Sequence, residues 1–578
     1  MCGIIGYKGN RKASEIVHQG LQKLEYRGYD SAGTAYTEKN KIKVEKAEGE
    51  VQKLQKTQTE SKTGIGHTRW ATHGGVNETN AHPHTCHKKE VAVVHNGIIK
   101  NHKQLKQQIG KEKFTSDTDT EVIPHLIQKH LQKGQEFLEA CKKVEQKLEG
   151  SYAVVATHKN GEIVAFKKDS PLVLGINQNE IFLASDTTPF VQHTETAKFL
   201  KNRDIVHIPH HTQHTIQNQK HGQVERETQK IEWSGEEITK EDHAHYMHKE
   251  IHEQQTTVKR AAFQDKTDIQ KTVKLLEDAE NIYLTGCGTS GFATEIGAKY
   301  LRQELEQNVI PVLSHELEHR KHKPGKKDIV IALSQSGETA DLLAALEQTE
   351  APIIAITNVK GSTLVRKSKE QLFINAGPEI GVASTKSFTG QIAVLKLLQY
   401  GLKDQIDQGR KSIIQTADKI EQTLNQNEET IEQISSRFAE EDNIYFIGRN
   451  KGYDVAKEAD LKLKELTYIH SESFPGGEFK HGNISLVEEG TPVVSFIKET
   501  GGEEIISNTL EAQSRGADII AVGQEQMPEF KHQIQIPTDD NSEILETIPF
   551  QLIAYRTSVK KGNNPDKPRN LAKSVTVK

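Results

Sequence analysis

Short apolar runs separated by turn residues dominate the first part of the chain. The runs include EVAVVHNG at 90–97, SYAVVATH at 151–158 and IVAFKK at 163–168, and Gly, Asn and Asp stand around them. Runs of this length, rich in β-branched residues and bounded by turn residues, are typical of strands. We therefore expect residues 2–225 to form a sheet-rich domain.

From about residue 275 the pattern changes to apolar strands that are each followed by a segment long enough for a crossover helix. The strands are NIYLTGCG at 281–288, DIVIALSQSG at 328–337 and PIIAITNV at 352–359. Strands that alternate with helices predict a parallel α/β sheet with helices on both faces.

This α/β pattern recurs after about 162 residues, since NIYFIGRN at 443–450 repeats NIYLTGCG. An internal duplication follows, and we expect two doubly wound domains, at 270–410 and 435–565. The segment 226–250 is highly charged and lacks an apolar period, which predicts a linker before them.

Composition narrows the class of function. The chain has 578 residues, too many for one hydrophobic core, and 75 Lys and Arg stand against 80 Asp and Glu. No basic tail or face indicates nucleic acid or a membrane surface, so we expect a small-molecule substrate. Four cysteines without CxxC spacing, and a start without a leader or membrane span, predict a cytoplasmic protein.

Cys2 directly follows the initiator methionine, and removal of that methionine would leave a thiol and a free α-amine on one residue. An α-amine with a pKa of about 8 can accept the proton of a thiol whose pKa is about 8.5. Cys2 is therefore a candidate nucleophile that needs no separate histidine.

Four motifs accompany Cys2: EYRGYDSAG at 25–33, HTRWATHG at 67–74, VHNG at 94–97 and TSDTDTE at 115–121. In this order they resemble amidotransferases with an amino-terminal nucleophile, which implies an αββα N-terminal-nucleophile (Ntn) fold over residues 2–225. Hydrolysis of glutamine needs an arginine for its carboxylate, an acid for its ammonium and donors for the oxyanion.

The resemblance implies one role for each of these residues. Arg69 would bind the α-carboxylate and Asp119 the α-ammonium, while the Asn96 side chain and the Gly97 amide would form the oxyanion hole. Arg27 would hold the loop around Cys2. The residues implied to line the glutamine pocket are Trp70, which also gates an ammonia passage in the resembling enzymes, Thr72 and His73.

The second half carries three loops with hydroxyl side chains: GCGTS at 286–290, LSQSGETAD at 333–341 and EIGVASTKS at 379–387. The second follows a strand and precedes a helix, where anions are favoured, and it matches neither a Walker loop nor GxGxxG. The three loops resemble the sugar isomerase (SIS) domains of hexosamine synthases. The implied sugar-phosphate contacts are Thr289, Ser290, Ser334, Gln335, Ser336, Thr339, Val382 and Ser384.

Isomerisation moves a proton between C1 and C2 of the sugar and needs one well-placed carboxylate. The helical spacing of Glu458, Lys462 and Glu465 puts the three on one face. By resemblance, Glu465 transfers the proton, Lys462 steadies the developing charge and Glu458 supports both. His481 would open the sugar ring from a neighbouring subunit, which implies a homodimer.

The tail 566–578 includes DKPRNLAKSVTVK and resembles a family loop in which Lys573 forms an imine with the sugar and Ala572 lies against it. The resemblance thus covers almost the whole chain, in the order of the glutamine:fructose-6-phosphate aminotransferases. It implies that glutamine and fructose 6-phosphate are the substrates, that ammonia passes between two sites, that no cofactor or metal is needed, and that the product begins hexosamine biosynthesis.

Some positions depart from the family pattern: Asp460 replaces a small residue, Asn483 replaces a proline, and 252–258 lacks a proline. They put the efficiency of the isomerase half in question.

An amidotransferase of purine or asparagine synthesis would need nucleotide or diphosphate sites, which are missing after residue 250. A sugar-phosphate sensor that no longer turns over is disfavoured, because Glu465, His481 and Lys573 are retained. The segment HELEH at 315–319 matches the zinc-binding pattern HExxH, but no third zinc ligand is evident.

Overall fold

The structure is a computed structural model that describes residues 2–55, 57–71, 73–110, 113–209, 213–231, 239–498 and 502–575. Its contacts divide the chain into two compact units. The first comprises Met1–Thr239 with Ala572–Lys578, and the second comprises Lys240–Leu571. Within 226–250, expected as a linker, the residues Gln229–Lys230 form a strand of the first unit and a helix of the second begins at Tyr246.

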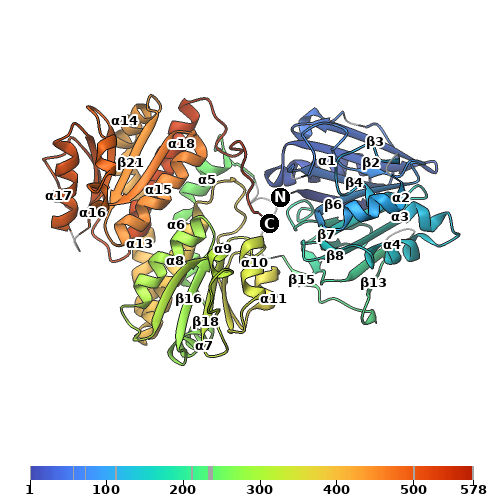
Figure 1. Ribbon diagram of the computed structural model, residues 1–578, viewed down its shortest axis with the longest axis horizontal. Helices are drawn as coiled ribbons and strands as arrows, with labels where there is room; N and C mark the ends of the chain where they lie inside the picture. Colours follow the sequence, from blue (N-terminus) through green and yellow to red (C-terminus); the bar gives the residue numbers. More distant parts are fainter. Residues whose placement is uncertain are drawn as a thin grey trace. The chain divides into compact units, whose positions relative to one another are not determined.

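The first unit consists of two antiparallel sheets with helices on their outer faces (Figure 1). One sheet has the order β15-β11-β9-β10-β1-β4-β2-β3. Its strands are β1 (Gly3–Lys8), β2 (Ser31–Glu38), β3 (Lys41–Glu48), β4 (Thr63–Arg69), β9 (Val173–Ile176), β10 (Ile181–Ala184), β11 (Thr196–Phe199) and β15 (Gln229–Lys230).

The other sheet of this unit has the order β14-β13-β12-β8-β7-β6-β5. Its strands are β5 (His84–Thr85), β6 (Val91–Ile99), β7 (Gly150–His158), β8 (Ile163–Lys168), β12 (Asp204–Ile208), β13 (Thr215–Asn218) and β14 (Gly222–Gln223). The helical segments are α1 (Ala13–Leu24), η1 (Glu25–Arg27), η2 (Val51–Lys53), α2 (His102–Ile109), α3 (Val122–Leu131) and α4 (Phe137–Glu145).

Alternation along β6 explains the layers of the first unit. Val91 and Val93 belong to the core that the sheet forms with α2, α3 and α4, whereas Ala92 and Val94 belong to the core between the two sheets. Successive side chains of a strand point to opposite faces, so one strand serves both cores. The helix–sheet–sheet–helix arrangement agrees with the expected αββα fold.

The second unit contains two parallel five-stranded sheets with the same strand order, β17-β16-β18-β19-β20 and β22-β21-β23-β24-β25. The first has β16 (Asn281–Gly286), β17 (Asn308–Leu313), β18 (Ile329–Ser334), β19 (Ile353–Thr357) and β20 (Glu370–Phe373). The second has β21 (Asn443–Gly448), β22 (His470–Pro475), β23 (Pro492–Phe496), β24 (Asp518–Gly523) and β25 (His532–Gln535). Equal order in both confirms the duplication.

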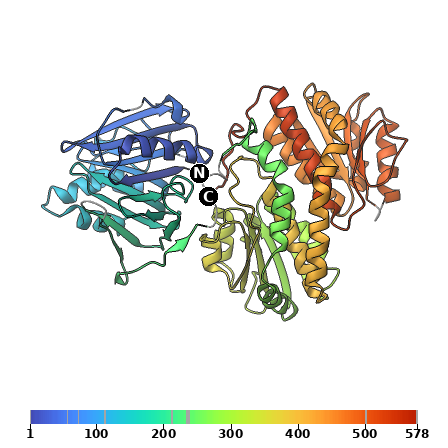
Figure 2. The same cartoon turned by 180° about the vertical axis from the view of Figure 1, so that it is seen from behind.

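Helices cover these sheets and fill the space between them (Figure 2). They are α5 (Tyr246–His252), α6 (Gln254–Ala262), α7 (Lys266–Glu277), α8 (Thr289–Leu301), α9 (Ser314–Leu317), α10 (Ala340–Glu347), α11 (Thr363–Lys367), α12 (Lys386–Leu402), α13 (Ile406–Gln426), α14 (Glu428–Phe438), α15 (Lys451–Thr467), α16 (Gly476–Phe479), η5 (Asn483–Leu486), α17 (Gly502–Gln513) and α18 (Ser542–Lys560). The pairs α8–α12 and α15–α18 pack within the first and second repeat, and the pair α8–α15 joins the two repeats. One apolar core extends through both repeats of the second unit.

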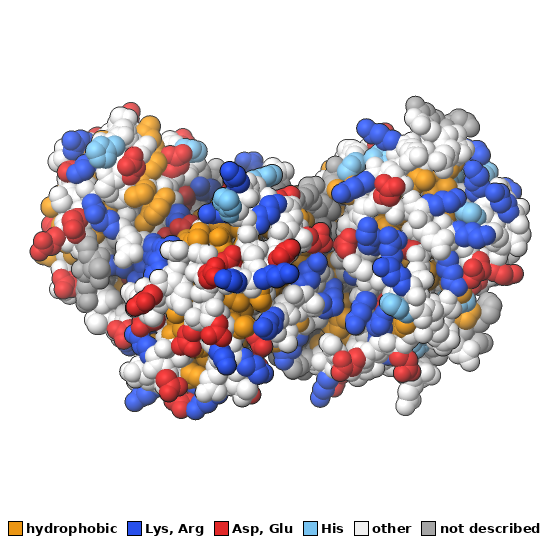
Figure 3. Space-filling model, turned by 60° about the horizontal axis from the view of Figure 1, so that its bottom comes forward, with side chains coloured by type: hydrophobic (Ala, Val, Ile, Leu, Met, Phe, Trp, Pro, Cys, Tyr) orange, Lys and Arg blue, Asp and Glu red, His pale blue; other side chains and the backbone are white. Residues whose placement is uncertain are grey.

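Side chains of both charge signs are mixed over the face drawn in Figure 3. None of the described helices has the length and apolar character needed to span a bilayer. All four cysteines are free thiols.

Candidate functional sites

Cys2 lies immediately before β1, with its thiol against the backbone of Trp70. The Trp70 N–H donates to Cys2 Sγ at 3.2 Å, and Sγ lies 3.5 Å from the Trp70 carbonyl oxygen. Burial raises the pKa of the Cys2 thiol, although the amino terminus acts in the opposite direction. The resting group is therefore the neutral thiol, and a nearby base has to remove its proton before it can attack.

The expected oxyanion-hole residues lie beside Cys2 on β6. Asn96 Nδ2 donates to the Cys2 carbonyl oxygen at 2.7 Å and to Ser185 Oγ at 3.0 Å. Gly97 has a φ of +121°, and a Cβ there would lie 2.0 Å from the Ser151 carbonyl oxygen. Only glycine fits this position.

His67 fixes the orientation of the Asn96 amide. Its Nε2 lies 3.1 Å from Asn96 Oδ1 and 3.0 Å from the His95 carbonyl oxygen. Both partners are acceptors, so Nε2 carries the proton and donates to them. Burial lowers the pKa of His67 to about 3, which keeps the imidazole neutral. Asn96 must then direct its Nδ2 donor toward Cys2.

Arg27 braces the same corner, as expected from the sequence. Its Nε donates to the Cys2 carbonyl oxygen at 3.3 Å, and its Nη1 donates to Asp186 Oδ2 at 2.6 Å. The Tyr26 hydroxyl donates to the same Asp186 oxygen at 2.6 Å. Sequence reasoning missed Ser185 and Asp186, which follow β10; their polar side chains at a strand end were the available signal.

Arg69 and Asp119 are both buried. The Arg69 guanidinium donates to the carbonyl oxygens of His73, at 2.6 Å, and of Gly74, at 3.0 Å. Asp119 Oδ2 accepts the Ile99 N–H at 2.7 Å. Backbone groups thus fix the orientations of both charged side chains.

The remaining residues expected around glutamine are Trp70, Thr72 and His73. The Trp70 ring packs edge-on against Tyr29, with centroids 5.9 Å apart. The His73 ring packs edge-on against His102 at 5.7 Å. Thr72 lies outside the described residues.

The expected phosphate loop follows β18 and leads into α10. Ser334 Oγ accepts the Gly337 N–H at 3.0 Å and lies 3.0 Å from Thr339 Oγ1, and Ser336 Oγ accepts the Glu338 N–H at 3.2 Å. Gly337 has a φ of +64°, and a Cβ there would lie 2.2 Å from Ser362 Oγ. The loop therefore gathers three hydroxyls at a helix N-terminus, where the helix dipole favours an anion.

Gln335, in the same loop, is held by its backbone, because its carbonyl oxygen accepts the Asn358 N–H at 3.2 Å.

Three charged residues of α15 meet the start of α8. Lys462 Nζ lies 2.5 Å from Glu465 Oε2, 3.1 Å from Thr289 Oγ1 and 3.6 Å from Glu458 Oε1. Thr289 Oγ1 also donates to Glu458 Oε1 at 3.3 Å, and Ser290 Oγ accepts from Gln391 Nε2 at 3.0 Å. The expected helical face thus forms one connected polar cluster.

The electrostatics of this cluster follow from its burial. Desolvation raises the pKa of Glu458 to about 8. Burial opposes the charged form of Lys462, but the carboxyl groups of Glu458 and Glu465 raise its pKa overall. Lys462 is therefore a fixed cation among two carboxyl groups and one hydroxyl.

The other expected sugar contacts lie on separate segments. Val382 is buried, and Ser384 Oγ donates to Glu379 Oε2 at 3.1 Å. His481, after α16, is exposed in this single chain. Ala572 and Lys573 are half-buried and group with the first unit. Their contact with the sugar stays a prediction.

Comparisons with known proteins show which domains and which family the chain matches. A family model described as glutamine amidotransferase domain matches residues 67–192, and one described as SIS domain matches 275–399 and again 437–561. Over 604 residues the chain is 41% identical to the glutamine–fructose-6-phosphate aminotransferase (isomerizing) of Halobacterium salinarum, with 100% of both chains covered. The enzyme of the same name from Pyrococcus horikoshii is 40% identical over 603 residues, again with full coverage.

The chain belongs to the glutamine–fructose-6-phosphate aminotransferase (isomerizing) family. The expected amidotransferase domain followed by two SIS domains is confirmed, and the two SIS matches correspond to the duplicated sheets.

Two solved structures match just over half of the chain. The C-terminal domain of glucosamine-fructose-6-phosphate aminotransferase from Francisella tularensis matches with 30% identity and a TM-score of 0.53, covering 57% of this chain and 99% of that one. Tagatose-6-phosphate ketose/aldose isomerase from Escherichia coli, at 21% identity and a TM-score of 0.51, covers 57% of this chain and 96% of that one and shares the fold.

Two of the positions that depart from the aminotransferase family pattern, Asp460 and Asn483, can be placed in the structure. Asp460, although on α15, accepts a hydrogen bond from Ser471 Oγ and lies 3.0 Å from Lys464 Nζ. Both of its oxygens are thus engaged by groups other than the Lys462 cluster. Asn483 begins the short helix η5.

The HELEH segment does not form a helical pair of histidines. Helix α9 ends at Leu317, so His319 lies beyond it, and both His315 and His319 are exposed. No group of three or more His, Cys, Asp or Glu arranged to hold a metal occurs in the part of the chain that the structure describes.

Proposed function

We propose that the chain transfers the amide nitrogen of L-glutamine to D-fructose 6-phosphate, producing L-glutamate and D-glucosamine 6-phosphate. The observation that carries the proposal is the presence, in one chain, of a polar cluster around Cys2 and a second polar cluster around Lys462. Cys2 lies beside the Asn96 donor, and Lys462 lies 2.5 Å from Glu465. We assign the first step to residues 2–225 and the second to 270–410, 435–565 and the tail 566–578.

In the first step, the α-amine of Cys2, once Met1 is removed, accepts the thiol proton, and the sulfur attacks the amide carbon of glutamine. Asn96 Nδ2 and the Gly97 N–H stabilise the oxyanion, a contribution worth about 3 kcal/mol for one donor. The amine returns the proton as the C–N bond breaks and ammonia leaves. Water then cleaves the thioester and releases glutamate.

Arg69 and Asp119 would orient the substrate by pairing with its α-carboxylate and α-ammonium. Their backbone hydrogen bonds support this role, because a preorganised charge loses little entropy on binding. Trp70, Thr72 and His73 would line the pocket, with Trp70 controlling passage of ammonia.

In the second step, the hydroxyls of Ser334, Ser336 and Thr339, with the α10 N-terminus, would bind the phosphate. Lys573 would condense with the C2 carbonyl of the open ketose to form an imine, with release of water. Ammonia would then replace the lysine nitrogen at C2. Glu465 would take a proton from C1 and deliver one to C2, which converts the ketose skeleton into the amino aldose.

The other proposed sugar contacts are Thr289, Ser290, Gln335, Val382, Ser384 and Ala572. His481 of a partner subunit would open the ring, so we propose a homodimer; exposure of His481 in one chain supports this. We also propose a cytoplasmic location, which suits a protein with four free thiols.

The test is a stoichiometric assay of the purified full chain with glutamine and fructose 6-phosphate. We expect glutamate and glucosamine 6-phosphate in equal amounts, and the C2A variant should form neither. Glutamate without amino sugar would contradict the transfer but leave the glutaminase step standing.

A further inference from the structure

The loop between β20 and α12 carries Val382 and Ser384, two residues proposed to contact the sugar. Inside this loop Glu379 folds back on the start of α12. Its Oε1 accepts the N–H groups of Thr385 and Ser387, both at 3.0 Å, and its Oε2 accepts the Ser387 hydroxyl at 2.8 Å. The C-terminal end of the loop is therefore fixed by a residue of the loop itself, Glu379.

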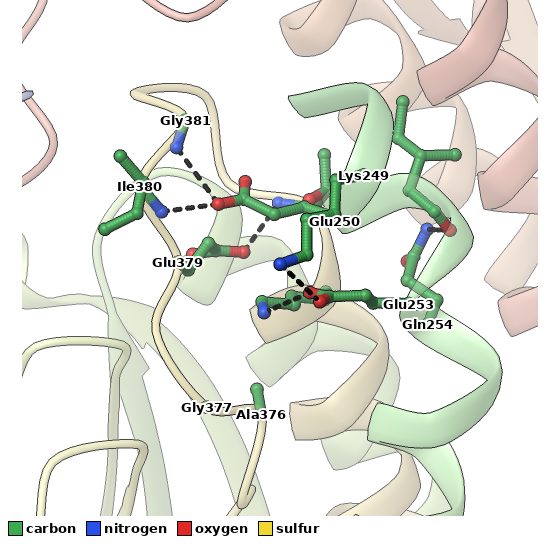
Figure 4. Close-up of polar contacts among 12 residues, drawn as sticks. Lys249, Glu250, Glu253, Gln254, Ala376, Gly377, Glu379, Ile380 and Gly381 are labelled. Atoms are coloured by element: carbon green, nitrogen blue, oxygen red, sulfur yellow. Dashed lines mark hydrogen bonds and ion pairs between the residues drawn. The ribbon is translucent and has the colours of Figure 1, made fainter. Parts of the chain in front are cut away.

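The middle of the loop is held from outside, by Glu250 of α5. Glu250 Oε1 accepts the Ile380 N–H at 2.5 Å and the Gly381 N–H at 3.2 Å (Figure 4). Glu250 is buried and stands 130 residues away in the chain. Two donors on one buried carboxylate make a strong, directional contact, because charge-assisted bonds strengthen away from water.

Gly381 is fitted to this carboxylate. A Cβ at Gly381 would lie 2.9 Å from Glu250 Oε2, closer than a real Cβ approaches, while the next neighbours, atoms of Met247, are at 3.5 Å. The glycine thus leaves room for the Glu250 carboxylate, which a methyl group would displace.

Helix α5 is in turn fixed by Asp566, at the start of the C-terminal tail. Asp566 accepts the N–H groups of Tyr246 and Met247, both at 2.9 Å, at the first turn of α5. The carbonyl oxygen of Asp566 accepts the Val382 N–H at 3.3 Å. Loop, helix and tail therefore form a closed ring of contacts.

We propose that Glu250 is a positioning residue for sugar binding, which sets the conformation of the loop at Val382 and Ser384 through the backbone of Ile380 and Gly381. This inference rests on the proposed function, because Val382 and Ser384 have their roles only there. Through Asp566 the same ring ties the loop to the tail, in which Lys573 follows Asp566 by seven residues. Glu250 itself need not touch the sugar.

The test compares E250A and E250Q with E253Q in the full chain. Glu253 is a second carboxylate on the adjoining helical segment, but it pairs with Lys386 at 2.7 Å and with Lys249 at 3.5 Å. We expect E250A to raise the KM for fructose 6-phosphate about tenfold or more, with a smaller rise for E250Q and less than about twofold for E253Q. The KM for glutamine and the sugar-independent hydrolysis of glutamine should stay unchanged.

G381A probes the contact from the loop side and completes a double-mutant cycle. Alone, it should raise the KM for the sugar, because its methyl group displaces the carboxylate. In the E250A background it should add little, since the atom that it meets has gone. Direct calorimetric binding of fructose 6-phosphate to C2A protein gives the same comparison without turnover.

The outcomes separate the two proposals. An unchanged sugar KM in soluble E250A and E250Q, or independent effects of G381A and E250A, would overturn the positioning role. If the wild-type chain binds no fructose 6-phosphate, the proposed function fails instead. A parallel loss of glutamine hydrolysis in the variants would indicate general damage and also overturn the inference.

Discussion

Lys462 Nζ lies 2.5 Å from Glu465 Oε2 but 3.6 Å from Glu458 Oε1, although both carboxyl groups are within one turn of it on α15. The two glutamates therefore differ in how closely they pair with the lysine. Glu458 is fully buried and its pKa is raised to about 8 by desolvation, so at neutral pH it mostly retains its proton. Glu465 is the partner of the lysine, and we propose that it carries the proton transfer.

Removal of the lysine charge should affect the sugar step alone. We expect K462M to lower the rate of glucosamine 6-phosphate formation about 100-fold, because Glu465 loses its oriented ion pair. Hydrolysis of glutamine without sugar should stay unchanged. K464M is the matched control, since Lys464 lies on the same helix but pairs with Asp460. Equal losses in both reactions, or in both variants, would contradict the assignment.

The raised pKa of Glu458 makes stability depend on pH. Its ordinary value is 4.5 and its value in the folded chain is about 8, so between these pH values unfolding releases a proton. The free energy of unfolding should therefore fall as pH rises, by about 1.4 kcal/mol per pH unit from this group.

E458Q removes this contribution. Its stability relative to wild type should improve steadily from about pH 5 to pH 8. Urea unfolding followed at several pH values measures the difference. A difference that does not vary with pH would show that Glu458 is already ionised in the folded chain.

His67 should act on glutamine hydrolysis by orientation and not by titration. We expect H67F to lower kcat about tenfold, because Asn96 loses the donor that directs its amide, against about 100-fold for N96A. Burial already lowers the pKa of His67 to about 3. The pH dependence of the residual activity should therefore match that of wild type, and a displaced acid limb would show that His67 titrates during the reaction.

Gly337 should be required for phosphate binding. G337A places a methyl group 2.2 Å from Ser362 Oγ at a φ of +64°, so the loop must shift and its hydroxyls must separate. We expect the KM for fructose 6-phosphate to rise about tenfold or more. G325A is the control, because a Cβ at Gly325 meets only Asp328, at 3.9 Å. Unchanged sugar affinity in G337A would place the phosphate elsewhere.

Local patterns predicted the parts of the fold that local chemistry determines. The strand at Val91–Ile99, the duplicated β16 and β21, and the shared face of Glu458, Lys462 and Glu465 each follow from residue spacing within one element.

Contacts between distant segments could not be derived in this way. Glu250 and Ile380 are 130 residues apart, and Asn96 and Ser185 are 89 apart, so their pairing depends on tertiary packing. Asp460 illustrates the same limit: its place on α15 was evident, but its bond to Ser471 follows from the packing of the strand after α15. The orientation of the His67 proton depends equally on two acceptors that only the fold brings together.

Isotopic labelling tests whether the amide nitrogen of glutamine passes from the Cys2 site to the sugar. The wild-type chain is given glutamine labelled with ¹⁵N in the amide, fructose 6-phosphate and an excess of unlabelled ammonium, and the product is examined by mass spectrometry. We expect glucosamine 6-phosphate that carries mostly ¹⁵N. Amino sugar with unlabelled nitrogen, or labelled ammonia without amino sugar, would contradict this transfer.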